Sequence, residues 1–130
     1  MDPISNMLTA IINAQRVNKE RVAVPYSNFN LALAEFLQQQ DLVVKLRVQD
    51  GKRKRVVITL AYDNREPVIQ SLKRLSKPGN RKYVTSEELP FTGNRPGIYV
   101  LSTSSGLMNG EKARSKGLGG ELLCEIWRNK

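Results

Sequence analysis

The sequence predicts an α+β protein made of two small α/β halves packed side by side. Apolar residues recur at helical spacing in two segments near the start, and from Leu42 onward they recur at every second position, as in strands. Turn-forming residues at 63–67 separate this first half from a second half that is mainly strand-like. We therefore predict N-terminal helices on a three-stranded sheet in residues 1–64, and a mainly antiparallel sheet with one short helix in residues 65–130.

The composition predicts a polyanionic partner. The 130 residues include 21 Lys and Arg against 12 Asp and Glu, a formal net charge of +9. Residues 65–130 hold twelve basic and six acidic side chains, and residues 1–64 hold nine and six, so the second half is the predicted main binding half. With no histidine and a single cysteine, Cys124, the sequence lacks a histidine-dependent catalytic set, a zinc cluster and an internal disulfide. We predict no catalytic residue, metal site or cofactor.

Two amphipathic helices are predicted in the first half. Asp2 followed by Pro3 is typical of a helix N-terminus, and this helix is expected to end between residues 15 and 18. A short strand at 22–25 follows. Ser27 is then the predicted N-cap of a second helix over residues 28–40. The apolar stripe of the first helix consists of Ile4, Met7, Leu8, Ile11 and Ile12.

A β-hairpin is predicted next, with its turn at Asp50-Gly51. Val44, Leu46 and Val48 alternate with polar residues, so they are expected to face the helices. The tip, from Lys52 to Arg55, is the densest charge run in the chain. Such a run is either a solvated turn that protects an edge strand or a set of phosphate contacts, which add affinity and salt dependence but no sequence discrimination.

The second half opens with two strand-like runs on either side of a turn at residues 76–79. Basic residues surround this turn with Tyr83 among them, which is typical of sites that bind phosphates and an exposed sugar or base. Alternatively, Tyr83 packs in the core with its hydroxyl at the rim. A capped helical turn at 85–88, ended by Pro90, and a loop at 91–96 are expected to lead into a strand at 97–101.

That strand is expected to deliver a run of short hydroxyl side chains, Ser102 to Ser105. Gly106 permits a turn, Asn109 is a predicted N-cap of a short basic helix, and Gly117 is placed to end that helix. Serine-rich connections often only turn the chain. Their small side chains also let a backbone approach a polyanion and hydrogen-bond its phosphate and ribose oxygens.

The chain is predicted to close with a strand in which Leu122, Cys124 and Ile126 all face inward. The glycines at 117–120 lack the Gly-Lys-Ser/Thr ending of a phosphate loop and follow a helix instead of opening one, so a tight chain reversal is the favoured interpretation. This reversal would bring Glu121 to the serine run. There it could accept hydrogen bonds from Ser104, from backbone N–H groups or from RNA.

Three segments resemble motifs of the small-subunit ribosomal protein eight family: STSSGLMNGEKARSKGLGGE at 102–121, DPISNMLTAIIN at 2–13 and PVIQSLKRLSKPGNRKYV at 67–84. The resemblance covers nearly the whole chain. It implies a non-enzymatic structural component of the small ribosomal subunit, which binds ribosomal RNA of the central domain directly and supports its folding and assembly. The implied partners are small-subunit ribosomal RNA and neighbouring ribosomal proteins, with the protein a monomer in the ribosome and no membrane or small-molecule substrate.

The chain departs from the family pattern at several basic positions. Ala10 and Ile12 stand where the family usually has arginines, Asn28 and Asn30 replace lysines, and Ser105 occupies a position that is often lysine. Phosphate contacts from these positions are therefore not expected. The RNA contacts of the first half are expected to be reduced, or that face to be covered by another protein.

The predicted RNA-binding residues combine side-chain chemistry with the resemblance. In the first half they are Thr9, Asn13, Ser27, Lys52, Arg53, Lys54 and Arg55. Around the turn at 76–79 they are Lys73, Arg74, Lys77, Pro78, Gly79, Arg81 and Tyr83. In and after the serine run they are Ser102, Thr103, Ser104, Ser105, Gly106, Asn109, Lys112, Arg114 and Glu121.

Two other function classes stay open. One is a free RNA-binding regulator of translation, and the less favoured one is a small nucleotide-binding enzyme. No apolar run is long enough to span a bilayer, and the chain opens directly at a helix start without a leader. We expect a protein of the cytoplasmic ribosome of a bacterium, or of an organellar ribosome if it is organelle-encoded.

Overall fold

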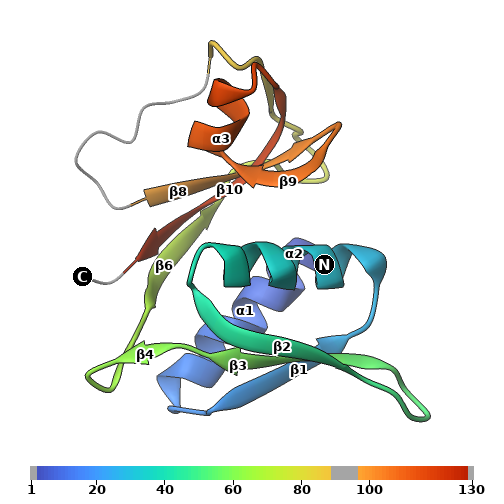
Figure 1. The fold of residues 1–130 in the computed structure, drawn as a ribbon, viewed down its shortest axis with the longest axis vertical. Coiled ribbons are helices and arrows are strands. Elements are labelled where there is room, and N and C mark those ends of the chain that lie inside the picture. Colours follow the sequence, from blue (N-terminus) through green and yellow to red (C-terminus); the bar gives the residue numbers. More distant parts are fainter. Residues whose placement is uncertain (1–2, 89–96, 129–130) are drawn as a thin grey trace. The chain divides into compact units, whose positions relative to one another are not determined.

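A computed structural model describes residues 3–88 and 97–128 of the chain. The chain divides into two compact units, residues 1–69 and residues 70–130, so the first unit includes 65–69 in addition to the predicted 1–64. Each unit contains helix and antiparallel strands (Figure 1), which confirms the predicted α+β class. Within the described residues, no helix is both long and apolar enough to cross a membrane.

The N-terminal unit contains the two predicted helices, α1 (Pro3–Arg16) and α2 (Asn28–Gln39). The apolar stripe of α1 is buried at Ile4, Met7, Leu8 and Ile11, as predicted. The predicted capping residue Asp2 lies outside the described residues. Ser27 is the N-cap of α2, because its hydroxyl accepts a hydrogen bond from the N–H of Asn30 at 3.0 Å.

Three antiparallel strands complete this unit in the order β1-β3-β2. They are β1 (Arg21–Pro25), β2 (Val43–Gln49) and β3 (Arg55–Leu60). Figure 1 shows α1 and α2 together on one face of this sheet. Val24, Val56 and Ile58 are buried toward that face, because residues two apart on a strand point the same way.

The prediction that Val44 faces the core is wrong. The register shifts between Val43 and Lys45, so Val43 pairs with Leu60 and is buried while Val44 is 57% exposed. An extra residue in one strand changes which side chains point inward. Leu46 and Val48 keep the expected orientation and are half-buried, since β2 is an edge strand.

The turn-forming segment at 63–67 is a tight two-stranded hairpin, β4 (Tyr62–Asp63) and β5 (Glu66–Pro67). Asn64 and Arg65 form its two-residue loop with φ of 51° and 69°. Positive φ at both loop positions matches the twist of the flanking strands. The hydroxyl of Tyr62 also donates a 2.6 Å hydrogen bond to the carbonyl of Lys19, which ties the hairpin to the connection between α1 and β1.

The C-terminal unit is a sheet built around the long strand β10 (Gly120–Arg128), in the order β6-β10-β8-β9 with β7 also paired to β10. The other strands are β6 (Ile69–Arg74), β7 (Tyr83–Val84), β8 (Gly97–Thr103) and β9 (Gly106–Asn109). The short helix α3 spans Gly110–Ser115. The sequence did not predict β9, because residues 106–109 were expected to turn directly into the helix.

The capping predicted for the turn at residues 85–90 is confirmed in its described part, residues 85–88. The N–H of Thr85 donates to a carboxylate oxygen of Glu88 at 2.9 Å, and the N–H of Glu88 donates to the Thr85 hydroxyl at 3.2 Å. These reciprocal hydrogen bonds are those of a capping box. Pro90 and the predicted loop at 91–96 lie outside the described residues.

The core of the C-terminal sheet is divided by a bulge in β10. Leu122 lies opposite Leu101, whereas Cys124 lies opposite Val100, because the register shifts between Leu122 and Cys124. Adjacent residues of a strand face opposite ways, so Leu122 and Cys124 lie on opposite faces and the prediction of one inward face is wrong. Cys124 is fully buried, and burial raises the pKa of its thiol to about 12.

Candidate nucleic-acid interface

The predicted serine run is the tip of the β8–β9 hairpin, and we call Ser102–Gly106 the hydroxyl turn. The sequence suggested that Ser102 and Thr103 lie in a loop, but they are the last residues of β8. The Thr103 hydroxyl donates to the carbonyl of Gly106 at 2.8 Å and accepts from the N–H of Ser105 at 3.1 Å. Thr103 therefore holds the turn in shape.

Ser104 and Ser105 are the exposed hydroxyl residues of the hydroxyl turn. Within residues 3–88 and 97–128 their side chains have no hydrogen-bond partner, so both hydroxyls can bind a ligand. Gly106 has a φ of 106°, a conformation that favours glycine. The result is a rigid turn that presents small donor-acceptor groups outward.

Two glycines bring β10 against this turn. A Cβ on Gly120 would collide with the carbonyl of Ser102, and a Cβ on Gly119 would collide with the carbonyl of Val84. Only glycine lets backbones approach this closely. As a consequence, Glu121 lies directly opposite Ser102 on one side and directly opposite Tyr83 on the other. These three residues form one row across a single face of the sheet.

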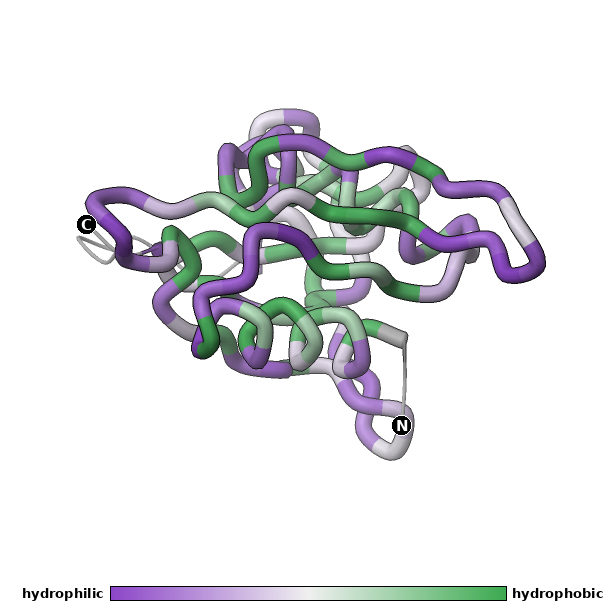
Figure 2. Tube along the Cα trace, turned by 90° about the horizontal axis from the view of Figure 1, so that it is seen from below, coloured by the Kyte–Doolittle hydropathy of each residue, from purple (hydrophilic) through white to green (hydrophobic). Residues whose placement is uncertain are grey.

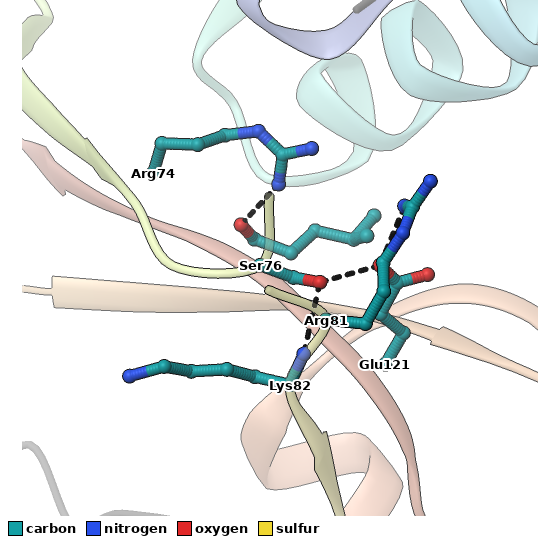
Figure 3. A network of polar contacts seen from close by, with 6 residues as sticks. Arg74, Ser76, Arg81, Lys82 and Glu121 are labelled. Carbon is teal, nitrogen blue, oxygen red and sulfur yellow. Dashed lines mark hydrogen bonds and ion pairs between the residues drawn. The ribbon is translucent and has the colours of Figure 1, made fainter. Parts of the chain in front are cut away.

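Glu121 is held by a hydrogen-bond network, shown in Figure 3. The fully buried hydroxyl of Ser76 donates to Oε2 of Glu121 at 2.5 Å and accepts from the N–H of Lys82 at 3.1 Å. Arg81 donates to the same carboxylate oxygen at 3.0 Å. Ser104 was one of several donors suggested for Glu121; the serine that donates is Ser76, 45 positions away in sequence.

The charge state of Glu121 follows from this network. Partial burial would raise the pKa of its carboxyl, but the hydrogen bonds from Ser76 and Arg81 and the positive charges of Arg81 and Arg74 outweigh burial and hold the pKa below its ordinary value of 4.5. The side chain is therefore an ionised acceptor at neutral pH. Its other oxygen, Oε1, has no partner among the described residues.

Arg74 contacts the protein's own backbone. Its Nη1 donates to the carbonyl of Leu123 at 2.7 Å, and the N–H groups of Leu75 and Ser76 donate to the same oxygen. The bulge at Leu123 thus accepts three hydrogen bonds and fixes the chain that leads into the turn at 77–80. The ends of that turn are joined by reciprocal backbone hydrogen bonds between Lys77 and Asn80.

Exposed cations surround the network. Lys77, Pro78 and Gly79 are exposed at the turn, and Lys73 is exposed on β6. Tyr83 is 70% exposed, so its predicted alternative as a core residue is wrong. Its ring is open to solvent at one end of the Tyr83–Glu121–Ser102 row.

Helix α3 is capped as predicted. The Asn109 side chain accepts from the N–H of Lys112 at 2.8 Å, which confirms it as the N-cap. Gly117 has a φ of 67°, and the next N–H, of Leu118, donates back to Ala113 at 2.8 Å, as in a Schellman motif. Lys112 and Arg114 are exposed on this helix.

The predicted residues of the N-terminal unit lie apart from this cluster in the chain and have simpler surroundings. Thr9 and Asn13 are exposed one turn apart on α1. Ser27 is occupied as the N-cap of α2. At the hairpin tip, Lys52 to Arg55 are all exposed, and the Lys54 ammonium lies 4.2 Å from the centre of the Tyr26 ring.

The sequence interpretation placed Ser76 and Lys82 at the turn but did not predict their part in the network around Glu121. A serine before Lys-Pro-Gly predicts only a turn residue, because nothing in the local pattern shows that its hydroxyl is buried. The signal that could have found it is the acidic Glu121, which stands among basic and hydroxyl residues and, where it is partly buried, needs a hydrogen-bond donor from the protein.

Fold and site together define a small basic α+β protein with a rigid hydroxyl turn, a fixed carboxylate and exposed cations around them. No group of acidic or thiol side chains able to hold a metal ion occurs in the part of the chain that the structure describes. The family model described as ribosomal protein S8 matches residues 2–127. The chain therefore belongs to the ribosomal protein S8 family, which confirms the resemblance in its motifs and the prediction of a structural protein that is not an enzyme.

Individual relatives agree with this family. The chain is 46% identical over 126 residues to small ribosomal subunit protein uS8 of Oleidesulfovibrio alaskensis, covering 97% of this chain and 98% of the relative. It is also 46% identical over 125 residues to the protein of the same name from Neisseria meningitidis serogroup C, covering 96% of each chain. The protein of that name from Desulfovibrio desulfuricans is 46% identical over 126 residues, with 97% and 98% covered.

Proposed function

We propose that this chain is a structural component of the small ribosomal subunit that binds ribosomal RNA of the central domain directly and supports its folding and assembly. The observation that carries the proposal is the single row formed by Tyr83, Glu121 and Ser102, next to the exposed hydroxyls of Ser104 and Ser105. The names of its relatives, small ribosomal subunit proteins, support it.

The geometry suits a folded RNA better than a regular duplex. Side chains read the 2′-hydroxyls and base edges of RNA in a shallow groove or at unpaired positions, by short polar contacts and by stacking. Ser104 and Ser105 offer such contacts, Tyr83 offers an exposed ring, and Oε1 of Glu121 can accept a hydrogen bond from a base amine or a ribose hydroxyl. The cations Lys77, Lys112 and Arg114 add attraction to phosphates.

Replacing Ser104 by Ala tests the proposed contact without changing charge. We expect the specific affinity for small-subunit RNA to fall by about 1–2 kcal/mol, the scale of one lost polar contact. A binding titration of the full chain against cognate RNA measures this. The matched control is Ser115→Ala, which removes an exposed hydroxyl at the end of α3 outside the site and should leave affinity unchanged. Equal affinities of Ser104→Ala and the parent would reject the contact.

Sucrose-gradient fractionation distinguishes a ribosomal component from a free regulator of translation. A component should travel with the small subunit at high salt, as a monomer bound to RNA and to neighbouring ribosomal proteins. A protein found only in the free fractions would contradict the proposal. The bacterial origin of the relatives supports a ribosome of the bacterial type, in the cytoplasm of a bacterium or in an organelle.

A further inference from the structure

Strand β2 forms an open edge of the N-terminal sheet. The strand order is β1-β3-β2, so within the described residues β2 has a partner strand on one side only. Its seven residues, Val43–Gln49, include no proline. The opposite edge strand, β1, ends at Pro25, which has no N–H and whose carbonyl accepts a 2.8 Å hydrogen bond from the Asn30 side chain. The protein therefore partly closes one edge of this sheet and leaves the other open.

The backbone of β3 shows which groups of β2 point outward. The N–H of Leu60 donates to the carbonyl of Glu20, next to β1, so Leu60 and every second residue before it turn their backbone groups toward β1. The residues of this set that lie opposite β2 are paired as Ile58 with Leu46 and Val56 with Val48. Opposite residues of an antiparallel pair alternate between hydrogen-bonded and non-hydrogen-bonded. Leu46 and Val48 therefore point their N–H and C=O groups away from β3.

Four backbone groups are consequently unpaired at this edge, the N–H and C=O of Leu46 and those of Val48. Within residues 3–88 and 97–128, no donor or acceptor of the protein pairs with them. The carbonyl of Val44, by contrast, accepts from the Gln38 amide at 3.4 Å. A row of unpaired backbone groups along an edge strand is a template for a further strand.

The side chains of β2 give this edge two different faces. Hydrophilic and hydrophobic residues alternate along the strand toward the hairpin tip, as the colours of Figure 2 show. Lys45 and Arg47 are exposed, and the residues of β3 opposite them are uncharged. Leu46 and Val48 are half-buried on the helix side, and Val44 at the start of the edge is 57% exposed. The edge thus combines an apolar row on one face with positive charge on the other.

We propose that the edge of β2 binds an extended segment of another protein, with alternating acidic and apolar residues, as an additional antiparallel strand. The backbone of this segment pairs with the four unpaired groups of Leu46 and Val48, which is how strand addition provides affinity. Its carboxylates lie opposite Lys45 and Arg47, since the Cβ atoms of directly opposite residues are about 5 Å apart. Its apolar side chains cover the exposed parts of Leu46 and Val48.

The chemistry of the edge selects this partner over two others. RNA has acceptors for the cations, but the carbonyls of Leu46 and Val48 need donors at strand spacing, which a sugar-phosphate backbone does not provide. A second copy of this chain paired through β2 would bring Lys45 and Arg47 against the same cations of its neighbour, and like charges in opposite positions are destabilising. An added strand extends the sheet sideways and leaves its faces open, so this inference goes beyond the proposed function and is independent of it.

The test uses the full chain and two short peptides with blocked ends, one alternating Glu and Val and the other alternating Lys and Val. We expect the Glu peptide to bind saturably in calorimetry, and the Lys peptide to bind at least about tenfold more weakly because its charges repel Lys45 and Arg47. In hydrogen exchange measured by NMR, the Glu peptide should slow exchange of the N–H groups of Leu46 and Val48 at least about tenfold. The N–H of Arg47 already points toward β3 and should change much less.

Backbone methylation of the Glu peptide separates strand addition from simple charge attraction. The Val residues of the peptide lie opposite Leu46 and Val48, so a methyl group on their nitrogens removes the donors to the edge. Methyl groups on the Glu nitrogens affect the outer side of the added strand only. We expect the Val-methylated peptide alone to lose affinity, by about tenfold or more. Equal affinities of the two methylated peptides overturn the proposal.

Charge reversal in the protein supplies a matched pair of variants. Lys45→Glu with Arg47→Glu should exchange the preference, so that the Lys peptide binds better than the Glu peptide, and this gain of binding also shows that the variant is folded. Arg16→Glu with Lys19→Glu reverses two exposed charges outside the sheet and should keep the preference of the parent. The same preference in the parent and in both variants overturns the proposal.

A short RNA duplex of arbitrary sequence is the last ligand to compare. If the duplex slows exchange of the N–H groups of Leu46 and Val48 and the Glu peptide does not, the edge contacts RNA and the proposal is wrong. Binding of cognate RNA by Ser104→Ala is a separate readout, so failure here leaves the proposed function untouched.

Discussion

The hydroxyl turn of the C-terminal unit and the exposed cations of the N-terminal sheet, Arg21, Lys45, Arg47 and Arg55, are two different kinds of polar surface. In the C-terminal unit, the polar groups are short, and their positions are fixed by hydrogen bonds to Ser76, by the Thr103 hydroxyl and by the close approach at Gly120. In the N-terminal unit, the cations are long side chains fixed only where they leave the sheet. Fixed short groups discriminate among RNA shapes, whereas long cations mainly attract phosphates. Under the proposed function we therefore expect the hydroxyl turn to contribute specificity and the N-terminal cations to contribute affinity.

The largest effect should come from breaking the fixed geometry at Gly120. Gly120→Ala places a Cβ on the carbonyl of Ser102, and we expect the free energy of unfolding to fall by about 2–3 kcal/mol, as for an overpacked core. Urea unfolding followed by the fluorescence of Trp127, the single tryptophan, measures the C-terminal unit. Gly79→Ala is the control, since a Cβ there has no neighbour within 4 Å. Matching losses for both variants would show that close packing at Gly120 is unimportant.

A smaller loss of stability should follow from removing one hydrogen-bonded serine hydroxyl in each unit. Ser76→Ala leaves the N–H of Lys82 and the partly buried carboxylate of Glu121 each short of one hydrogen bond, at a cost of about 1–3 kcal/mol. Ser27→Ala removes a helix N-cap and should cost about 1 kcal/mol. Only Ser76→Ala should also weaken binding to cognate RNA. If both variants weaken RNA binding to the same extent, the network around Glu121 does not position the site.

The smallest effect is expected on the stability of the protein at acidic pH. The pKa of Glu121 is lowered in the folded protein, so its carboxylate contributes stability that is fully present above the ordinary value of 4.5 and is lost as the pH falls through the lower folded pKa. Glu121→Gln should lack this loss, which unfolding measured from neutral pH to below 4.5 would reveal as a flatter profile than that of the parent. Lys45→Gln with Arg47→Gln, which removes two charges from the N-terminal unit and leaves Glu121 and its partners intact, should keep the parent profile. A parent and Glu121→Gln profile of the same shape would contradict the role of the carboxylate.

Much of the fold could be predicted from local sequence patterns. The two helices, the Ser27 and Asn109 caps and the hairpin at residues 43–60 were predictable because each depends on residues close together in the chain. Val44 was misplaced because a bulge shifts the register by one residue, and a period of two does not reveal where a bulge occurs.

The candidate site was less accessible to sequence reasoning. Its composition could be predicted, since small hydroxyls and cations lie next to one another in the sequence, but its organisation depends on contacts between distant segments. Ser76 and Glu121 meet because β6, which leads into Ser76, pairs with β10, and β7 pairs with β10 as well. The bulge at Leu123, whose carbonyl accepts from Leu75, Ser76 and Arg74, is equally invisible in the sequence.

Labelling of the buried thiol of Cys124 can report the opening of the C-terminal sheet. A thiol-specific alkylating reagent reacts with an accessible thiolate. In the closed sheet the Cys124 side chain is buried, and its raised pKa keeps the thiol protonated, so it does not react. Because the chain has one cysteine, each labelled molecule records one event at one place, a separation of β10 from its neighbours. The labelling rate with and without bound RNA therefore measures how firmly the ligand holds this sheet together.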